Sequence, residues 1–104
     1  MPVNVLNKTG TYETIAASQT GQVIGGAGAV GDYLSHLLVT PASTSPGAVT
    51  IIDGATSIIV FAGGASSVGS LIPFTIPLDI RSVSGAWSIT TGAAVSVIAV
   101  GITS

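Results

Sequence analysis

Apolar and polar residues alternate with a period of two along much of the chain, most regularly between Leu71 and Arg81. Every even position of that stretch is apolar: Ile72, Phe74, Ile76, Leu78 and Ile80. Because successive side chains of a strand point to opposite faces of a sheet, this alternation predicts a strand with one face in a core. Pro73 and Pro77 fall on the other face and lack the N–H that a ladder needs, so we expect this strand at a sheet edge.

The C-terminal part predicts a hairpin, with alternation over residues 86–91, a turn at Thr91-Gly92 and a returning strand over residues 94–100. The returning strand is apolar on both faces, because Val95 and Val97 point one way while Ile98 and Val100 point the other. Such a strand is covered on both sides, by a second sheet or by a neighbouring subunit.

The middle of the chain predicts three further strands. Ala48–Asp53 and Ser57–Phe61 are rich in Val and Ile, and Asp53-Gly54 between them is a strong turn signal. The segment Tyr33–Thr40 fits a short helix capped by Asp32 or a strand. We favour the strand, because the residues that follow have a strand pattern and Pro41 would end a helix after about two turns.

The N-terminal residues differ from the rest, with few large apolar side chains and five glycines between positions 21 and 31. Residues 1–30 therefore predict an extended arm that lies across a neighbouring molecule, and we expect its contacts at Val3, Val5, Tyr12 and Ile15. Residues 31–104 predict one domain of about six to eight short strands. The fold class is all-β, a small antiparallel β-sandwich or jelly roll with an extended N-terminal arm.

Charge is scarce in this chain. Only 6% of its 104 residues are charged and 47% are hydrophobic, whereas average domains carry about 25% charged residues. A freely diffusing protein normally depends on charge to stay apart from its neighbours. We therefore expect a building block that forms a homo-oligomer, a dimer or a trimer, with a mainly apolar interface.

The same composition argues against most chemistry. The chain has no cysteine, one histidine and four carboxylates, so we expect no metal, no cofactor, no small-molecule substrate and no enzymatic activity. Two cations, Lys8 and Arg81, are too few to bind nucleic acid or a membrane surface. The uncharged run Ala55–Leu78 is interrupted by glycines and prolines, so we expect no membrane span.

Three motifs invite a chemical interpretation. The glycines of Gly26–Gly31 match a dinucleotide fingerprint, but neither the preceding strand nor the following helix has the required length. Ser35 adjoins His36, which places the two side chains on opposite faces of a strand. Asp79 and Arg81 share one face and are able to form an exposed pair of little energetic value.

The amino-acid sequence beyond the arm resembles the sequences of small structural proteins encoded by tailed bacteriophages. The resemblance covers about Gly31–Gly101 and lies in six stretches: Gly31–Leu34, Leu37–Ala42, Thr44–Val49, Val60–Ala65, Ser84–Gly92 and Val95–Gly101. It implies a virion protein of a short-tailed phage, a capsid decoration or cement protein assembled in the host cytoplasm. Such proteins are similar to small jelly rolls that sit as dimers or trimers on the major capsid protein, and the resemblance carries over no functional residue.

Two alternatives remain open. The chain is also compatible with another virion component, such as a head fibre base or a tail or baseplate part. A carbohydrate-binding β-sandwich module is less favoured, because the aromatic residues are scattered along the chain instead of forming a cluster.

Overall fold

The computed structural model of the chain describes residues 11–26 and 28–103, which form strands and no helix. The strands are β1 (Thr11–Ile15), β2 (Gln22–Val23), β3 (Tyr33–Pro41), β4 (Val49–Asp53), β5 (Thr56–Phe61), β6 (Phe74–Arg81), β7 (Trp87–Thr91) and β8 (Val95–Ile102). The expected all-β class and the strand interpretation of Tyr33–Thr40 are confirmed.

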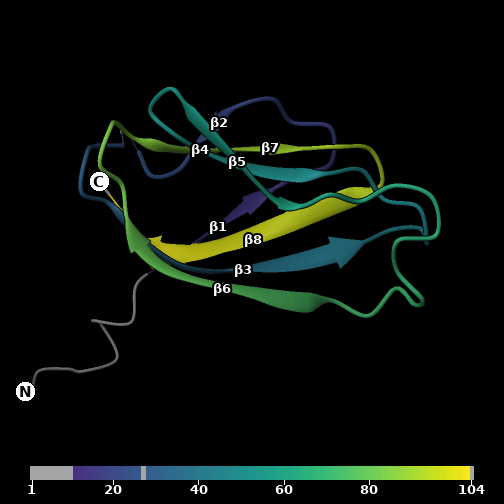
Figure 1. The fold of residues 1–104 in the computed structure, drawn as a ribbon. Helices are drawn as coiled ribbons and strands as arrows, with labels where there is room; N and C mark the ends of the chain where they lie inside the picture. The colour runs from purple at the N-terminus through teal and green to yellow at the C-terminus, as the bar shows by residue number, and fades with distance from the viewer. Residues whose placement is uncertain (1–10, 27, 104) are drawn as a thin grey trace, which may run out of the picture.

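The strands form two antiparallel sheets packed face to face (Figure 1). Sheet A has the order β1-β8-β3-β6 and sheet B the order β2-β7-β4-β5. Four of the strand pairs are nested along the chain: β1 pairs with β8, β2 with β7, β3 with β6 and β4 with β5. This order is the double Greek key of a jelly roll, so the predicted sandwich architecture is confirmed.

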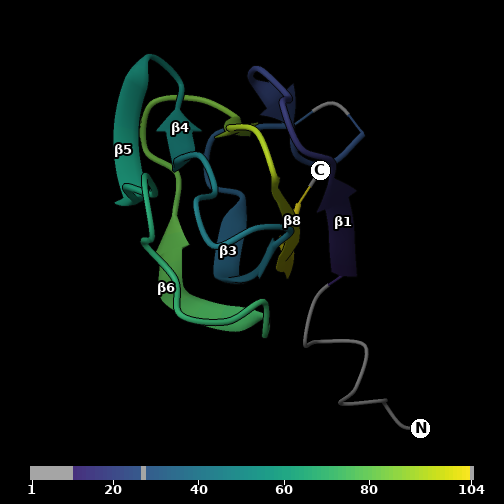
Figure 2. The same cartoon turned by 90° about the vertical axis from the view of Figure 1, so that its right-hand side faces the viewer.

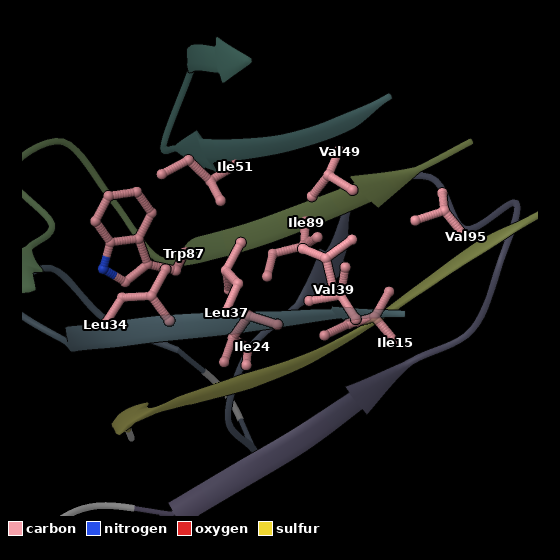
Figure 3. Packing of buried hydrophobic residues seen from close by; sticks show 12 residues of the cluster. Ile15, Ile24, Leu34, Leu37, Val39, Val49, Ile51, Trp87, Ile89 and Val95 are labelled. Atoms are coloured by element: carbon pink, nitrogen blue, oxygen red, sulfur yellow. The ribbon is translucent and has the colours of Figure 1, made fainter. Parts of the chain in front are cut away.

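The core lies between the sheets and follows the alternation of the strands (Figure 3). Leu37 and Val39 of sheet A and Ile51 and Ile89 of sheet B are almost completely buried. Trp87 is the largest buried side chain, and its indole Nε1 donates a hydrogen bond to the Asp32 carbonyl at 2.9 Å. This bond satisfies the polar atom of the indole inside the apolar core.

Two local predictions are confirmed. Strands β4 and β5 pair as a hairpin around Gly54, whose φ of 60° suits the first position of a tight hairpin turn. Strand β6 is an edge of sheet A, as Pro77 predicted, and Pro73 lies just before it. Phe74, Ile76 and Leu78 are partly buried against the core, as expected at an edge. The predicted core face is wrong at its two ends, because Ile80 is 37% exposed and Ile72 precedes the strand and is 72% exposed.

One predicted connection is wrong. Strands β7 and β8 do not form a hairpin, because β7 belongs to sheet B and β8 to sheet A. The short turn between them carries the chain from one sheet to the other, with Ala94 at a φ of 58°. A turn of this kind has the same sequence signals as a hairpin turn, so the pattern could not separate the two.

The boundary between arm and sandwich is also not at residue 30. Residues 11–15 and 22–23 pair with β8 and β7, and Ile15 and Ile24 are core residues. The described part of the expected arm therefore belongs to the sandwich. The expectation fails because few large apolar residues suffice where two short strands complete the edges of a small core.

Candidate functional site

The residues nearest to a chemical constellation lie at the beginning of β3 and on the adjacent β6. A register shift between Leu34 and His36 marks a β-bulge in β3. The bulge brings Ser35 Oγ within 3.1 Å of His36 Nδ1. The expectation that these side chains point to opposite faces is therefore wrong, because the extra residue of a bulge breaks the alternation.

Tyr33, beside this bulge, contacts two charged residues of β6. Its hydroxyl donates a hydrogen bond to the Asp79 carboxylate, and the Arg81 guanidinium lies 5.5 Å from the centre of its ring. The hydrogen bond to Asp79 and, to a smaller extent, burial raise the pKa of Tyr33. Arg81 Nη1 also donates to the Gly31 carbonyl at 3.1 Å. Asp79 and Arg81 thus both act on Tyr33.

In a Ser–His–Asp triad, an acidic group orients the histidine. In the described part of the chain each of the four carboxylates instead binds another group, and none of these hydrogen bonds goes to His36. Glu13 accepts hydrogen bonds from Gln22 Nε2 and from the Gly25 N–H, at 2.8 and 2.9 Å. Asp32 accepts one from the Ala29 N–H at 3.0 Å.

Asp53 provides the clearest example of a structural carboxylate. It is buried at the end of β4 and accepts hydrogen bonds from the N–H groups of Val83, Ser84 and Gly85, at 3.0, 3.0 and 3.2 Å. The N–H of Val83, followed by those of Ser84 and Gly85, lowers the pKa of Asp53 against the effect of burial. Asp53 therefore anchors the β6–β7 connection to the β4–β5 hairpin.

Two further features would indicate chemistry among residues 11–26 and 28–103: a cluster of metal ligands and a pocket. These residues contain no group of three or more His, Asp or Glu side chains able to hold a metal ion. No pocket opens among them. The glycines at 26, 28 and 31 precede strand β3 instead of a helix, so they lack the helix N-terminus that binds a pyrophosphate.

The distinctive surface of the molecule is the outer face of sheet A, which points away from the core. Cross-strand partners point to the same side of a sheet. Because Leu37, Val39, Val97 and Ala99 are buried in the core, their neighbours Leu38, Ile98 and Val100 point outward.

The registers place these outward residues in two rows across the four strands of sheet A. One row contains Tyr12, Val100, His36 and Pro77, and the next contains Thr14, Ile98, Leu38 and Thr75. Neither row contains a side chain with a permanent charge. We call these eight residues the A face.

The corresponding outer face of sheet B has a different character. Its two central strands present Thr50 and Ile52 from β4, and Ser88 and Thr90 from β7. Three of these four side chains are hydroxyl-bearing, whereas the central strands of the A face present Leu38, Ile98, Val100 and His36. The A face is therefore more apolar than the outer face of the central strands of sheet B. The contrast is confined to these positions, because Thr40 and Ser96 flank the A face and the edge strands of sheet B add the exposed Val23 and Ile59.

The contact residues predicted from the sequence lie in different environments in the structure. Tyr12 lies on the A face with 72% of its surface exposed, so it is free to meet a partner. Ile15 is wrong as a contact residue, because its side chain is buried in the core with 1% exposed. Val3 and Val5 lie outside the described residues. Leu38 was missed, although the adjacent Leu37-Leu38 in a strand is itself a signal of two apolar faces.

Comparisons of the chain with protein-family models, with curated proteins and with solved structures found no match. The residues that the structure describes include no helical segment with the length and hydrophobicity needed to cross a bilayer.

Proposed function

We propose that this protein is a non-catalytic structural component of a virus particle, a capsid decoration or cement protein of a tailed phage. In this proposal the A face binds the assembled capsid shell and stabilises it. The observation that carries the proposal is the apolar A face, which contrasts with the mainly hydroxyl-bearing outward residues of the central strands of sheet B.

The energetic argument concerns what the A face gains from a partner. Leu38, Ile98 and Val100 are half-buried by their sheet neighbours and keep part of their apolar surface in water. Full burial of such a side chain contributes up to about 1.5–3 kcal/mol relative to full exposure, so these residues together offer a few kcal/mol. Apolar side chains that lie side by side and remain partly in water are suited to an interaction surface.

The remaining features are consistent with a structural role. The carboxylates hold loops and edges in place, and the jelly roll is a frequent architecture among capsid and lectin domains. Fold alone does not determine function, so the argument rests on the surface. Many copies that each bind weakly to a shell raise its stability together, because binding to the assembled state opposes disassembly.

The test compares two isoleucines that lie in central strands on opposite outer faces. Ile98→Ser removes apolar surface from the A face, and Ile52→Ser makes the same change on the outer face of sheet B, where Ile52 is also half-buried. Purified variants are added to shells that lack this protein, prepared from a phage in which its gene has been deleted. Binding is measured by cosedimentation, and shell stability by the temperature of disassembly.

We expect the native protein and Ile52→Ser to bind and to raise the disassembly temperature, while Ile98→Ser binds at least about tenfold more weakly. Equal loss of binding in both variants would show that the A face is not the contact surface. If shells without the protein are equally heat-stable and do not bind it, the cement role is wrong. A tail or fibre location is then identified by labelling the protein in intact virions.

A further inference from the structure

We propose that two copies of this chain join through the free edges of their β5 strands, which pair antiparallel and form one continuous eight-stranded sheet from the two B sheets. This inference concerns the isolated protein and does not depend on the existence of a shell. It rests on the one long edge strand of the described fold that has no protection against pairing.

Edge strands expose unpaired N–H and C=O groups, and natural proteins usually blunt them with charges, prolines or irregular backbone. Strand β6 has such protection, with Pro77, Arg81 and Asp79, whose φ is 59°. Strand β1 contains Glu13, whose carboxylate is turned toward Gln22 and Gly25. Strand β2 has only two residues.

Strand β5 differs from all of these. Its sequence Thr-Ser-Ile-Ile-Val-Phe contains no charge, proline or glycine. The first four residues are exposed, and only a register shift near Val60, at the far end, interrupts the ladder to β4. Figure 2 shows β5 as the outermost strand on its side of the sandwich, with no described segment beyond it. An uncharged six-residue strand without proline or glycine, with Ile-Ile-Val-Phe at its end, is an aggregation hazard unless a defined partner covers it.

The side chain of Ile58 indicates how the two copies meet. Ile58 is paired with Ile51, whose side chain is 1% exposed in the core, so both point to the inner face of sheet B. Ile58 nevertheless remains 41% exposed, because no strand lies beyond it. A second β5 would place another isoleucine beside it and extend the core across the junction.

Symmetry restricts the register. Residues directly opposite in an antiparallel pair point to the same face. A twofold axis must therefore relate one residue of β5 to its own copy. With Ile58 at the axis, Ser57 lies opposite Ile59 of the second copy, and this pair occurs twice. No charged residue meets its own copy in this arrangement, so two identical edges are compatible.

The first test uses two double variants at the same positions. Ser57→Lys with Ile59→Lys places like charges opposite each other twice, whereas Ser57→Glu with Ile59→Lys places opposite charges there. The full chain and both variants are studied by sedimentation from about 1 µM to about 1 mM, because the area that an interface buries does not fix its affinity. Circular dichroism confirms that each variant has retained its strands.

We expect the native chain to reach a dimer mass, twice 10.1 kDa, within this range. The Lys/Lys variant should dimerise at least about tenfold more weakly, and the Glu/Lys variant should remain a dimer that weakens with added salt. A native chain that stays monomeric throughout, or forms a trimer, overturns the proposal. Equal behaviour of the two variants also overturns it.

The second test measures the register itself and uses the absence of cysteine from the chain. In the proposed dimer the Cβ atoms of the two copies of residue 58 come within the reach of a disulfide. Under mild oxidation Ile58→Cys should therefore form a covalent dimer rapidly. Ile72→Cys, at a loop position that is 72% exposed, is the control for random collision. Equal cross-linking rates for the two variants would refute pairing at β5.

Discussion

The separation of β3 into an inner and an outer face leads to a quantitative prediction for two adjacent leucines. Leu37 is completely buried between the sheets, whereas Leu38 is half-buried on the A face. Leu37→Ala and Leu38→Ala remove the same atoms from consecutive positions of one strand. The Leu→Ala change in intrinsic strand preference is therefore the same in both variants. The difference between their unfolding free energies then reports how the environments of the two side chains differ.

The expected magnitudes differ several-fold. Leu37→Ala leaves a cavity in a close-packed core, which costs about 2–5 kcal/mol. Leu38→Ala loses only contacts with neighbours on the same face, so we expect about 1 kcal/mol or less. Since small domains are stable by only about 5–15 kcal/mol, the first variant loses a large fraction of its stability.

Urea denaturation of the isolated protein measures both values. With a slope of about 2 kcal/mol per M, Leu37→Ala should lower the unfolding midpoint by about 1–2.5 M, and Leu38→Ala by about 0.5 M or less. If both variants lose the same stability, a further element covers the A face in the free protein. The reasoning behind the proposed shell contact would then be refuted, because the A face would not be open to a partner.

Two further predictions concern close approaches and charge. A Cβ at Gly101 would overlap the Tyr33 carbonyl oxygen, whereas nothing lies near a Cβ at Gly69; Gly101→Ala should therefore lower the melting temperature by several degrees and Gly69→Ala should leave it nearly unchanged, as calorimetry will show. The lowered pKa of Asp53 means that its stabilising effect is present above the unfolded-state value of about 4 and is lost as the pH falls through the lower folded-state value. Melting between pH 2 and pH 7 should therefore show a smaller acid-dependent loss in Asp53→Asn, and an unchanged slope would contradict the structural role of this carboxylate.

The sequence predicts the elements of this fold better than it predicts their connections. Alternation identified β6, and Pro77 placed it at an edge, because both signals depend on residues within one strand. The β7–β8 turn was misinterpreted as a hairpin because the choice between staying in one sheet and crossing to the other is made by packing. Ile15 and Ile24 were missed as core residues for a related reason, since their burial depends on the distant strands that cover them.

The surface was partly predictable. The two-sided apolar character of β8 indicated that Ile98 and Val100 meet something beyond the core, but periodicity cannot say whether that is a sheet or a partner. In the structure the core covers Val97 and Ala99, and none of the described strands packs over Ile98 and Val100. The bulge that brings Ser35 to His36 was not predictable, because no residue type in β3 signals it.

The two proposed surfaces are geometrically compatible, which makes the joint hypothesis more restrictive than either part. Two copies that share a continuous antiparallel sheet are related by a twofold axis perpendicular to that sheet. Both A sheets then lie on the same side of it, and both A faces point in the same direction. A dimer therefore presents two apolar faces to one underlying surface, and the second contact forms at a high effective concentration. Loss of β5 pairing should for this reason weaken shell binding even though the A face is unchanged. A Lys/Lys variant that is monomeric yet binds shells as tightly as the native dimer would separate the two surfaces and leave the A face to act alone.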